Sequence, residues 1–126
     1  MERMKLDIQR FGLDQWLSDS NGNEIYWRKA NQIHHYFIDI CGYKKGDNGK
    51  CLVKRKDLEN LLTLCNAILD DNFRAPSLLP TCPGFFFGSY DYDEWYFDQI
   101  KDTKEQLEEM LSAKTPHCRY YYSSWW

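Results

Sequence analysis

The chain has 126 residues, 16 Lys and Arg against 19 Asp and Glu, and a net charge of −3. This length fits one compact domain and leaves too little chain for two ordinary ones. The acidic balance argues against non-specific nucleic-acid binding, and no apolar run approaches the roughly 20 residues of a membrane span. The aromatic content of 17% exceeds what a small core needs, so we expect some rings on a working surface.

The first 22 residues are predicted to be a leader or loop segment. Charges interrupt every apolar stretch of residues 1–12, so this segment has no secretory signal, and a turn-forming run follows at residues 18–23. We therefore expect a cytoplasmic protein.

The five cysteines are odd in number and stand singly. A disulfide framework is therefore not expected in a reducing compartment. The candidate zinc ligands are His34, His35, Cys41 and Cys51, and their spacing matches no compact zinc finger or ribbon. We expect neither a metal nor a cofactor.

The first firm element is predicted to be a helix over residues 24–40, with Asn23 as its N-cap. Its apolar stripe comprises Tyr26, Ala30, Ile33, Phe37 and Ile40. Residues 41–53 resemble a hairpin with a four-residue turn at 46–49. A second helix is predicted over residues 58–69, where leucines recur at helical spacing.

Residues 84–88, GFFFG, are predicted to be a short strand between glycines. Asp91 or Asp93 is expected to cap a third helix, whose charged residues face water. Its inward positions are Tyr96, Ile100, Thr103, Leu107, Met110 and Leu111. The predicted fold class is α+β, with three helices packed on a small antiparallel sheet made of the hairpin and the strand. The domain spans residues 23–114, and residues 115–126 form an aromatic tail.

The familiar catalytic signatures are absent. The chain has no Walker loop, no GxGxxG after a strand, no GxSxG elbow and no HExxH. We therefore expect a binding protein rather than an enzyme.

Two segments combine rings with hydrogen-bonding groups. On the predicted first helix, Trp27, Asn31 and His34 share one flank beside Arg28 and Lys29. Such a patch can stack on a flat ring, read its edge and pair with a phosphate. The alternative interpretation places Trp27 and His34 in the core, with Arg28 and Lys29 paired to acids such as Glu24.

The second segment follows the predicted strand, at residues 84–97. We expect a binding groove between it and the first helix. The predicted ligand-binding residues are Trp27, Arg28, Lys29, Asn31, His34, Phe86, Ser89, Glu94 and Trp95.

Several blocks of the sequence resemble a family of small proteins encoded by phages and prophages of Firmicutes. These blocks are YWRKANQIHHYF at 26–37, LENLLTLC at 58–65, LLPT at 78–81 and GFFFGSYDYDEWYFDQI at 84–100. The resemblance covers roughly residues 24–112, implies a phage origin and implies no particular activity. MKLDIQRFG at residues 4–12 also resembles the opening of phage virion proteins.

The resulting hypothesis is a phage-encoded counter-defence protein that sequesters a nucleotide-like immune signal. One alternative is an anti-CRISPR-like inhibitor that binds a host defence protein through an aromatic surface. The residues expected to form that surface are Tyr120, Tyr121, Tyr122, Trp125 and Trp126. A second alternative is a virion or morphogenesis component. An exposed aromatic surface also favours self-association, and a homodimer could complete a pocket at its interface.

Overall fold

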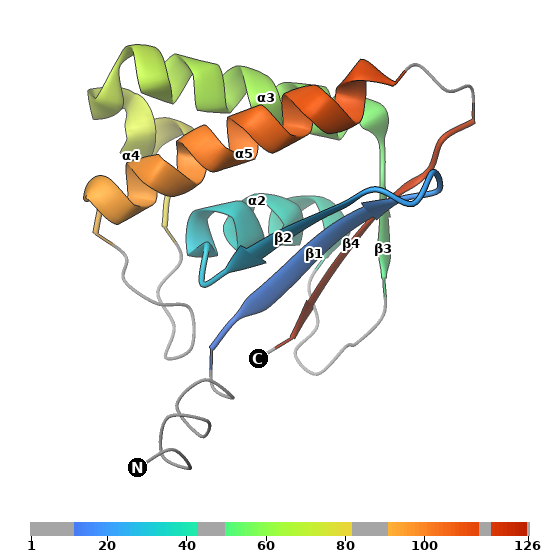
Figure 1. The fold of residues 1–126 in the computed structure, drawn as a ribbon. Coiled ribbons are helices and arrows are strands. Elements are labelled where there is room, and N and C mark those ends of the chain that lie inside the picture. Colours follow the sequence, from blue (N-terminus) through green and yellow to red (C-terminus); the bar gives the residue numbers. More distant parts are fainter. Residues whose placement is uncertain (1–11, 43–49, 82–90, 114–116, 126) are drawn as a thin grey trace, which may run out of the picture.

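The computed structural model describes residues 12–42, 50–81, 91–113 and 117–125. These residues form a four-stranded antiparallel sheet with helices on one of its faces (Figure 1). In chain order the elements are β1 (Asp14–Asp19), β2 (Glu24–Arg28), α2 (Asn31–Cys41), β3 (Cys51–Val53), α3 (Arg55–Asp70), the 3-10 turn η1 (Asn72–Arg74), α4 (Ala75–Leu78), α5 (Glu94–Ser112) and β4 (Tyr120–Trp125). The predicted α+β class is confirmed, whereas the described part has four α-helices instead of three.

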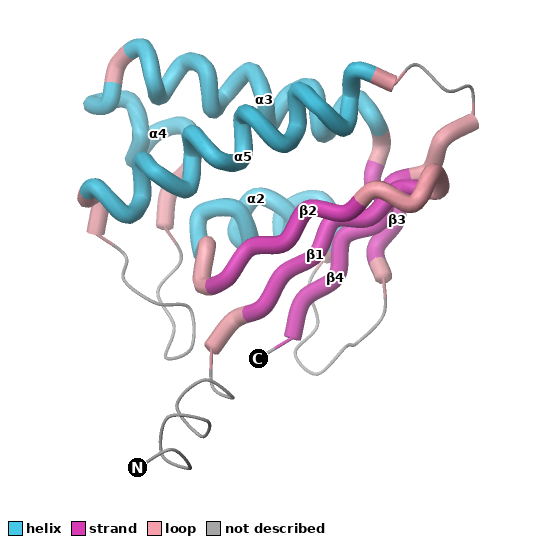
Figure 2. Tube along the Cα trace, viewed as in Figure 1, coloured by secondary structure: helices cyan, strands magenta, loops and turns pink. Residues whose placement is uncertain are grey.

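The spatial order of the strands is β2-β1-β4-β3, so the last strand in the sequence lies inside the sheet (Figure 2). β1 and β2 form a hairpin whose turn is held by Asp19. One carboxylate oxygen of Asp19 accepts the backbone N–H groups of Asn21 and Asn23 at 2.9 and 2.8 Å. The predicted leader, residues 1–22, thus contains β1, and the predicted tail, residues 115–126, contains β4. The two strands pair with each other along their full length.

The prediction of one helix over residues 24–40 is wrong for its first part. Residues 24–28 pair with β1 as a strand, and the helix begins only at Asn31. Lys29 separates the two elements in a left-handed conformation with φ 56°. Ala30, which precedes the helix, has both of its backbone groups bound by the buried side chain of Gln15. These two features end the strand and set the start of the helix.

The later helices follow the predicted periodicity. α3 buries Leu58, Leu61, Cys65 and Ile68, and α5 buries all six positions predicted to face inward. Asp93 caps α5 by accepting the Tyr96 N–H at 3.0 Å. The predicted strand at residues 84–88 and the hairpin turn at 46–49 lie outside the described residues. β3, the described strand of that hairpin, pairs with β4.

Cys41 and Cys51 form a disulfide, contrary to the expectation that the cysteines stay unpaired. Their Cα atoms are 6.0 Å apart, at the end of α2 and the start of β3. Spacing in the sequence gave no sign of this pair, because helix α2 and strand β3 bring the two residues together only in the folded chain. Of the remaining described cysteines, Cys65 is buried and Cys118 is partly exposed.

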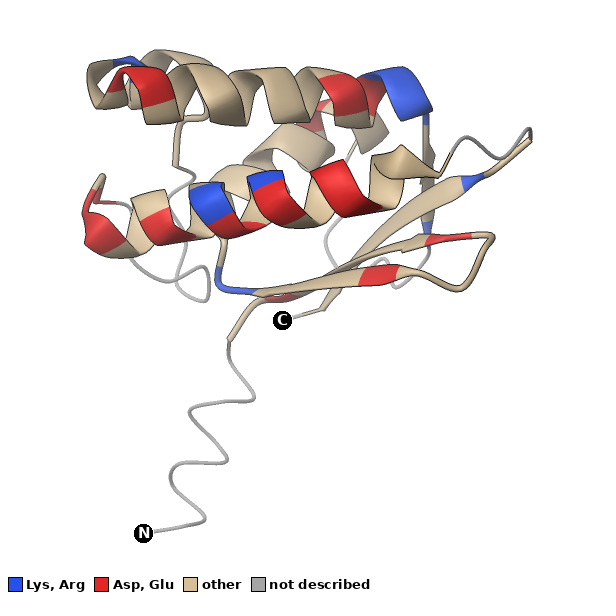
Figure 3. Cartoon of the chain, turned by 45° about the horizontal axis from the view of Figure 1, so that its top comes forward, with Lys and Arg blue, Asp and Glu red and all other residues tan. Residues whose placement is uncertain are grey.

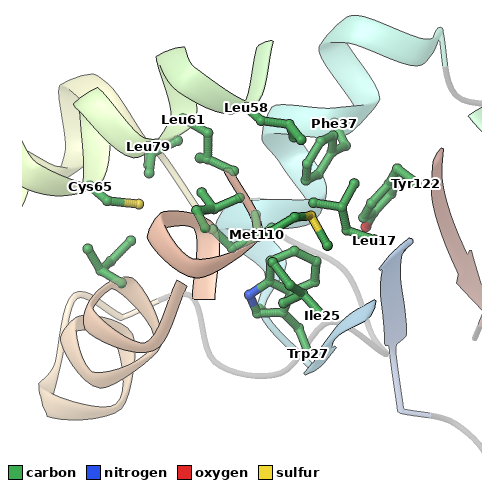
Figure 4. Packing of buried hydrophobic residues seen from close by; sticks show 14 of the residues in the cluster. Leu17, Ile25, Trp27, Phe37, Leu58, Leu61, Cys65, Leu79, Met110 and Tyr122 are labelled. Atoms are coloured by element: carbon green, nitrogen blue, oxygen red, sulfur yellow. The ribbon is translucent and has the colours of Figure 1, made fainter. Parts of the chain in front are cut away.

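The core lies between the inner face of the sheet and the helices (Figure 4). Leu17 and Ile25 from the sheet meet Phe37 from α2, and Phe37 stacks on Tyr122 with ring centroids 4.2 Å apart. α3 packs on α5 and closes the core from above (Figure 1). Among the described residues, all these contacts use one face of the sheet.

Candidate functional site: the outer face of the sheet

The predicted ligand residues of β2 point in opposite directions. Side chains alternate along a strand, so Trp27 and Arg28 cannot lie on one surface of the sheet. Trp27 enters the core with 3% of its surface exposed, and its indole N–H donates to the Thr103 hydroxyl at 2.8 Å. Arg28 lies on the other face, where it pairs with Asp14 at 2.6 Å. The helical flank that motivated the nucleotide site does not exist.

His34 and Asn31 lie in the first turn of α2 and are buried. The Nδ1 atom of His34 is 2.7 Å from the Tyr122 hydroxyl, which accepts from the Gln15 amide at 3.3 Å. Because that hydroxyl accepts from Gln15, it can donate its own proton to Nδ1 of a neutral His34. Burial lowers the pKa of His34 to about 4 and raises that of Tyr122. This group of side chains is a neutral hydrogen-bonded part of the core, as in the alternative interpretation.

The other predicted ligand residues are spread over the molecule. Glu94 and Trp95 begin α5, and Trp95 is 55% exposed. Lys29 is partly exposed between β2 and α2. Phe86 and Ser89 lie outside the described residues. The structure therefore does not gather the described members of this set around one groove.

The residues predicted as an aromatic tail also divide between the two faces. Tyr120 and Tyr122 are buried on the inner face, while Tyr121 is partly exposed and Trp125 is 51% exposed on the outer face. Trp126 lies outside the described residues. A protein-binding role for this segment can thus involve Tyr121 and Trp125, since its other described tyrosines hold the core.

The outer face of the sheet gathers aromatic side chains from three strands. The strand register places its residues in three rows across the sheet. The rows are Arg28–Asp14–Trp125, Tyr26–Trp16–Ser123 and Glu24–Ser18–Tyr121–Leu52. Trp16 lies in the middle row, directly opposite Tyr26 and diagonal to both outward aromatics of β4. The outward face of an antiparallel sheet is ordinarily polar, whereas this one carries four aromatic rings.

A polar contact and a ring contact hold Tyr26 in place on the outer face. The rings of Trp16 and Tyr26 are 5.8 Å apart and tilted by 48°. The Tyr26 hydroxyl donates to Asp14 at 2.5 Å, and Arg28 binds the same carboxylate oxygen. Burial and the hydrogen bond to Asp14 raise the pKa of Tyr26. This end of the face is therefore preorganised, which lowers the entropy cost of binding.

The sequence-based prediction did not include Trp16 and Leu52 among the surface residues. Leu52 is 62% exposed although it is a large aliphatic side chain. The signal was present in DQWLSD at Asp14–Asp19, where Gln15 and Leu17 alternate with Trp16. The alternation of a strand was not recognised here, because the apolar Trp16 faces outward and the polar Gln15 faces inward.

Charge is distributed unevenly over the molecule. α5 contains six acidic residues and two lysines, a net charge of −4 against −3 for the whole chain. Acidic residues recur along this helix in Figure 3. On the outer face, Asp14 and Arg28 form an ion pair, and Glu24 adds one negative charge. In the described part of the chain, no three His, Cys, Asp or Glu residues are grouped so as to hold a metal ion.

A cavity of about 120 Å³ lies between β2 and α5. It is lined by Asn23, Glu24, Ile25, Gln106, Glu109 and Met110. Since liquid water occupies about 30 Å³ per molecule, this volume corresponds to roughly four waters. Pockets for nucleotide-sized ligands span about 300–1,000 Å³, so this cavity is too small for one.

Comparisons with protein-family models, curated proteins and solved structures found no match. Among the described residues, no helix has the length and apolar character needed to cross a membrane.

Proposed function

We propose that the protein is a phage-encoded counter-defence protein that acts by binding a host defence protein through the outer face of its sheet. The observation that carries the proposal is the presence of Trp16, Tyr26, Tyr121 and Trp125 on one side of the sheet. Trp and Tyr are the residues most enriched among those that dominate the energy of protein interfaces. The phage context comes from the sequence resemblance.

A protein partner fits this face better than a nucleic acid does. Aromatic sheets that bind single-stranded nucleic acids combine stacking rings with a basic groove for the phosphates. Among the described residues of this face, the arginine, Arg28, is already paired with Asp14, and the net charge of the chain is negative. Aromatic rings beside an Asp14–Arg28 ion pair and Glu24 instead match an apolar patch with a polar rim on another protein.

The outer face also supports the protein-binding candidate over sequestration of a nucleotide. The described residues proposed for the nucleotide site lie in the core, on the outer face and at the start of α5, without a shared surface. The rings of the outer face, in contrast, come from neighbouring strands in fixed register.

The decisive experiment is a phage challenge of bacteria that carry a defence system and express this protein. Trp125→Ser removes an exposed ring from the outer face, and Trp95→Ser is the matched control, because Trp95 is similarly exposed on α5. We expect that Trp125→Ser no longer protects the phage against the defence system and that Trp95→Ser still does. Equal activity of the two variants would contradict the proposal.

A biochemical arm identifies the alternatives. Calorimetry with cyclic dinucleotides should show no heat of binding for the wild-type protein. Binding of such a ligand that Trp125→Ser leaves intact would support the nucleotide candidate instead. Recovery of the protein from purified phage particles would support the virion candidate.

A further inference from the structure

Strand β2 is an edge of the described sheet, and its backbone directions can be assigned. Lys29 donates its N–H to the Leu13 carbonyl at 2.7 Å, and Asp19 donates to the Asn23 carbonyl at 3.0 Å. In an antiparallel ladder, every second residue bonds to the same neighbour. The odd-numbered residues of β2 therefore direct their backbone N–H and C=O groups to β1. Glu24, Tyr26 and Arg28 direct theirs to the opposite edge, which pairs with no described strand.

One contact confirms this direction. The Gln99 amide of α5 donates to the Arg28 carbonyl at 3.3 Å, which requires that this carbonyl point away from β1. A carbonyl oxygen has two lone pairs, so it can accept a second hydrogen bond. The edge thus presents three residues for pairing with another strand.

We propose that β2 pairs with β2 of a second copy of this chain, antiparallel and about a two-fold axis at Tyr26. In this register Tyr26 lies opposite Tyr26 of the second copy, and both residues direct their backbone groups across the edge. The arrangement joins two four-stranded sheets into one of eight strands. It is an isologous interface, in which the same surface patch is used twice.

Charge complementarity selects this register and the second copy as occupant. Glu24 lies opposite Arg28 of the second copy, and the same pair forms again on the other side of the axis. Each Arg28 is then placed between Asp14 of its own chain and Glu24 of the other chain. A shift by two residues in either direction leaves both Glu24 and Arg28 without an opposite charge across the axis.

The two-fold pairing also extends the outer face described above. Tyr26 is 46% exposed and points outward beside Trp16. Pairing at Tyr26 makes the two middle rows continuous across the axis. The inference nevertheless stands apart from the proposed function, since it depends on the edge of β2 and not on what the outer face binds.

The dimer is expected to be weak. A five-residue edge is small beside the roughly 800 Å² per partner of a stable interface. The two α5 helices, each with a net charge of −4, also approach each other on the inner side. We expect a dissociation constant between about 1 μM and 1 mM.

Sedimentation equilibrium of the full chain, in about 0.15 M salt, tests the charge pairing. Glu24→Arg and Arg28→Glu each place like charges opposite one another across the axis, so each variant alone should remain monomeric. In an equimolar mixture the two variants complement each other, because every opposed pair then carries opposite charges. We expect the mixture to dimerise at least as well as the wild-type protein.

A cross-link tests the register without relying on those variants. Directly opposed residues of a hydrogen-bonded pair have Cα atoms about 5.5 Å apart, within the range of a disulfide. Tyr26→Cys should therefore form a covalent dimer on mild oxidation, and Tyr121→Cys, which lies away from the edge, should not. Absence of the Tyr26→Cys dimer, or equal cross-linking of both variants, would overturn the proposal, as would a mixture that stays monomeric although both of its variants are folded by circular dichroism.

Discussion

Gln15 binds both backbone groups of Ala30. Its Nε2 atom donates to the Ala30 carbonyl at 3.0 Å, and its Oε1 atom accepts the Ala30 N–H at 2.9 Å. This amide joins strand β1 to the start of α2. Because these two hydrogen bonds satisfy the amide, a polar side chain with 0% exposure can lie on the inner face of the sheet.

Gln15→Leu should destabilise the protein by about 2 kcal/mol, because it leaves the buried Ala30 N–H without its acceptor. The Ala30 carbonyl keeps the backbone N–H groups of Ile33 and His34 as donors. Urea unfolding followed by circular dichroism measures this loss. Gln106→Leu is the matched control, since Gln106 is partly exposed on α5 and its side chain binds the exposed Asp102 at 2.8 Å. A loss for Gln15→Leu no larger than that of the control would show that the Ala30 contact is dispensable.

Trp27→Phe should lower stability by about 2 kcal/mol, through the lost hydrogen bond to Thr103 and the space left by the smaller ring. Because Trp27 lies in the core, the variant should still protect phage in the challenge assay at a temperature where it is folded. Thermal unfolding and the challenge assay together check this expectation. If a fully folded Trp27→Phe variant no longer protected the phage, Trp27 would have a direct role in function.

Stability should fall as the pH is lowered from 6.5 towards 4. The pKa of His34 is about 4 in the folded protein against 6.5 in the unfolded chain, so the unfolded state binds more protons in this window. The full contribution of His34, present above pH 6.5, is about 3 kcal/mol. The measurement is urea unfolding at pH 7.5, 6 and 5 for wild type and His34→Gln.

The His34→Gln variant keeps an acceptor for the Tyr122 hydroxyl but cannot be protonated in this range. Its stability should therefore vary less with pH than that of the wild type. Equal slopes for the two proteins would mean that His34 does not control the acid sensitivity.

Reduction of the Cys41–Cys51 disulfide should cost about 3 kcal/mol, the entropy expected for closing a short loop in the unfolded chain. The two cysteines are separated by 10 positions in the sequence. Urea unfolding with and without dithiothreitol measures the cost, and peptide mass spectrometry without reductant identifies the pair. Cys41→Ser with Cys51→Ser should remove the effect, whereas Cys118→Ser should preserve it.

The two long helices, α3 and α5, could be predicted from the sequence because their apolar residues recur at helical spacing and face one core. The short α4 (Ala75–Leu78) was not predicted, because it is only four residues long and contains a proline. α5 is the clearest case, since Asp93 supplies the N-cap and its charged residues all face water. Helical spacing also occurs by chance between Tyr26 and Ala30, and it concealed the strand in which Ile25 and Trp27 alternate with exposed residues. Periodicity alone cannot separate these cases when the segment is short.

The candidate site was harder to predict than the fold. Tyr120, Tyr121 and Tyr122 are the same residue type, so no alternation between apolar and polar positions reveals which of them faces outward. The outer face also depends on pairing between β1 and β4, which are about 100 positions apart in the sequence. The aromatic content predicted a working surface, but only the register shows that Trp16 and Trp125 share it.

The interior position of β4 affects how this protein is made. During translation β1 and β2 emerge early, but the strand that fills the space between β1 and β3 leaves the ribosome after all the helices. Until then, the nascent chain exposes an unpaired edge of β1 and an apolar inner face. Such non-local pairing slows folding and exposes the chain to aggregation. We therefore expect chaperones to bind the newly made chain before residues 120–125 are in place.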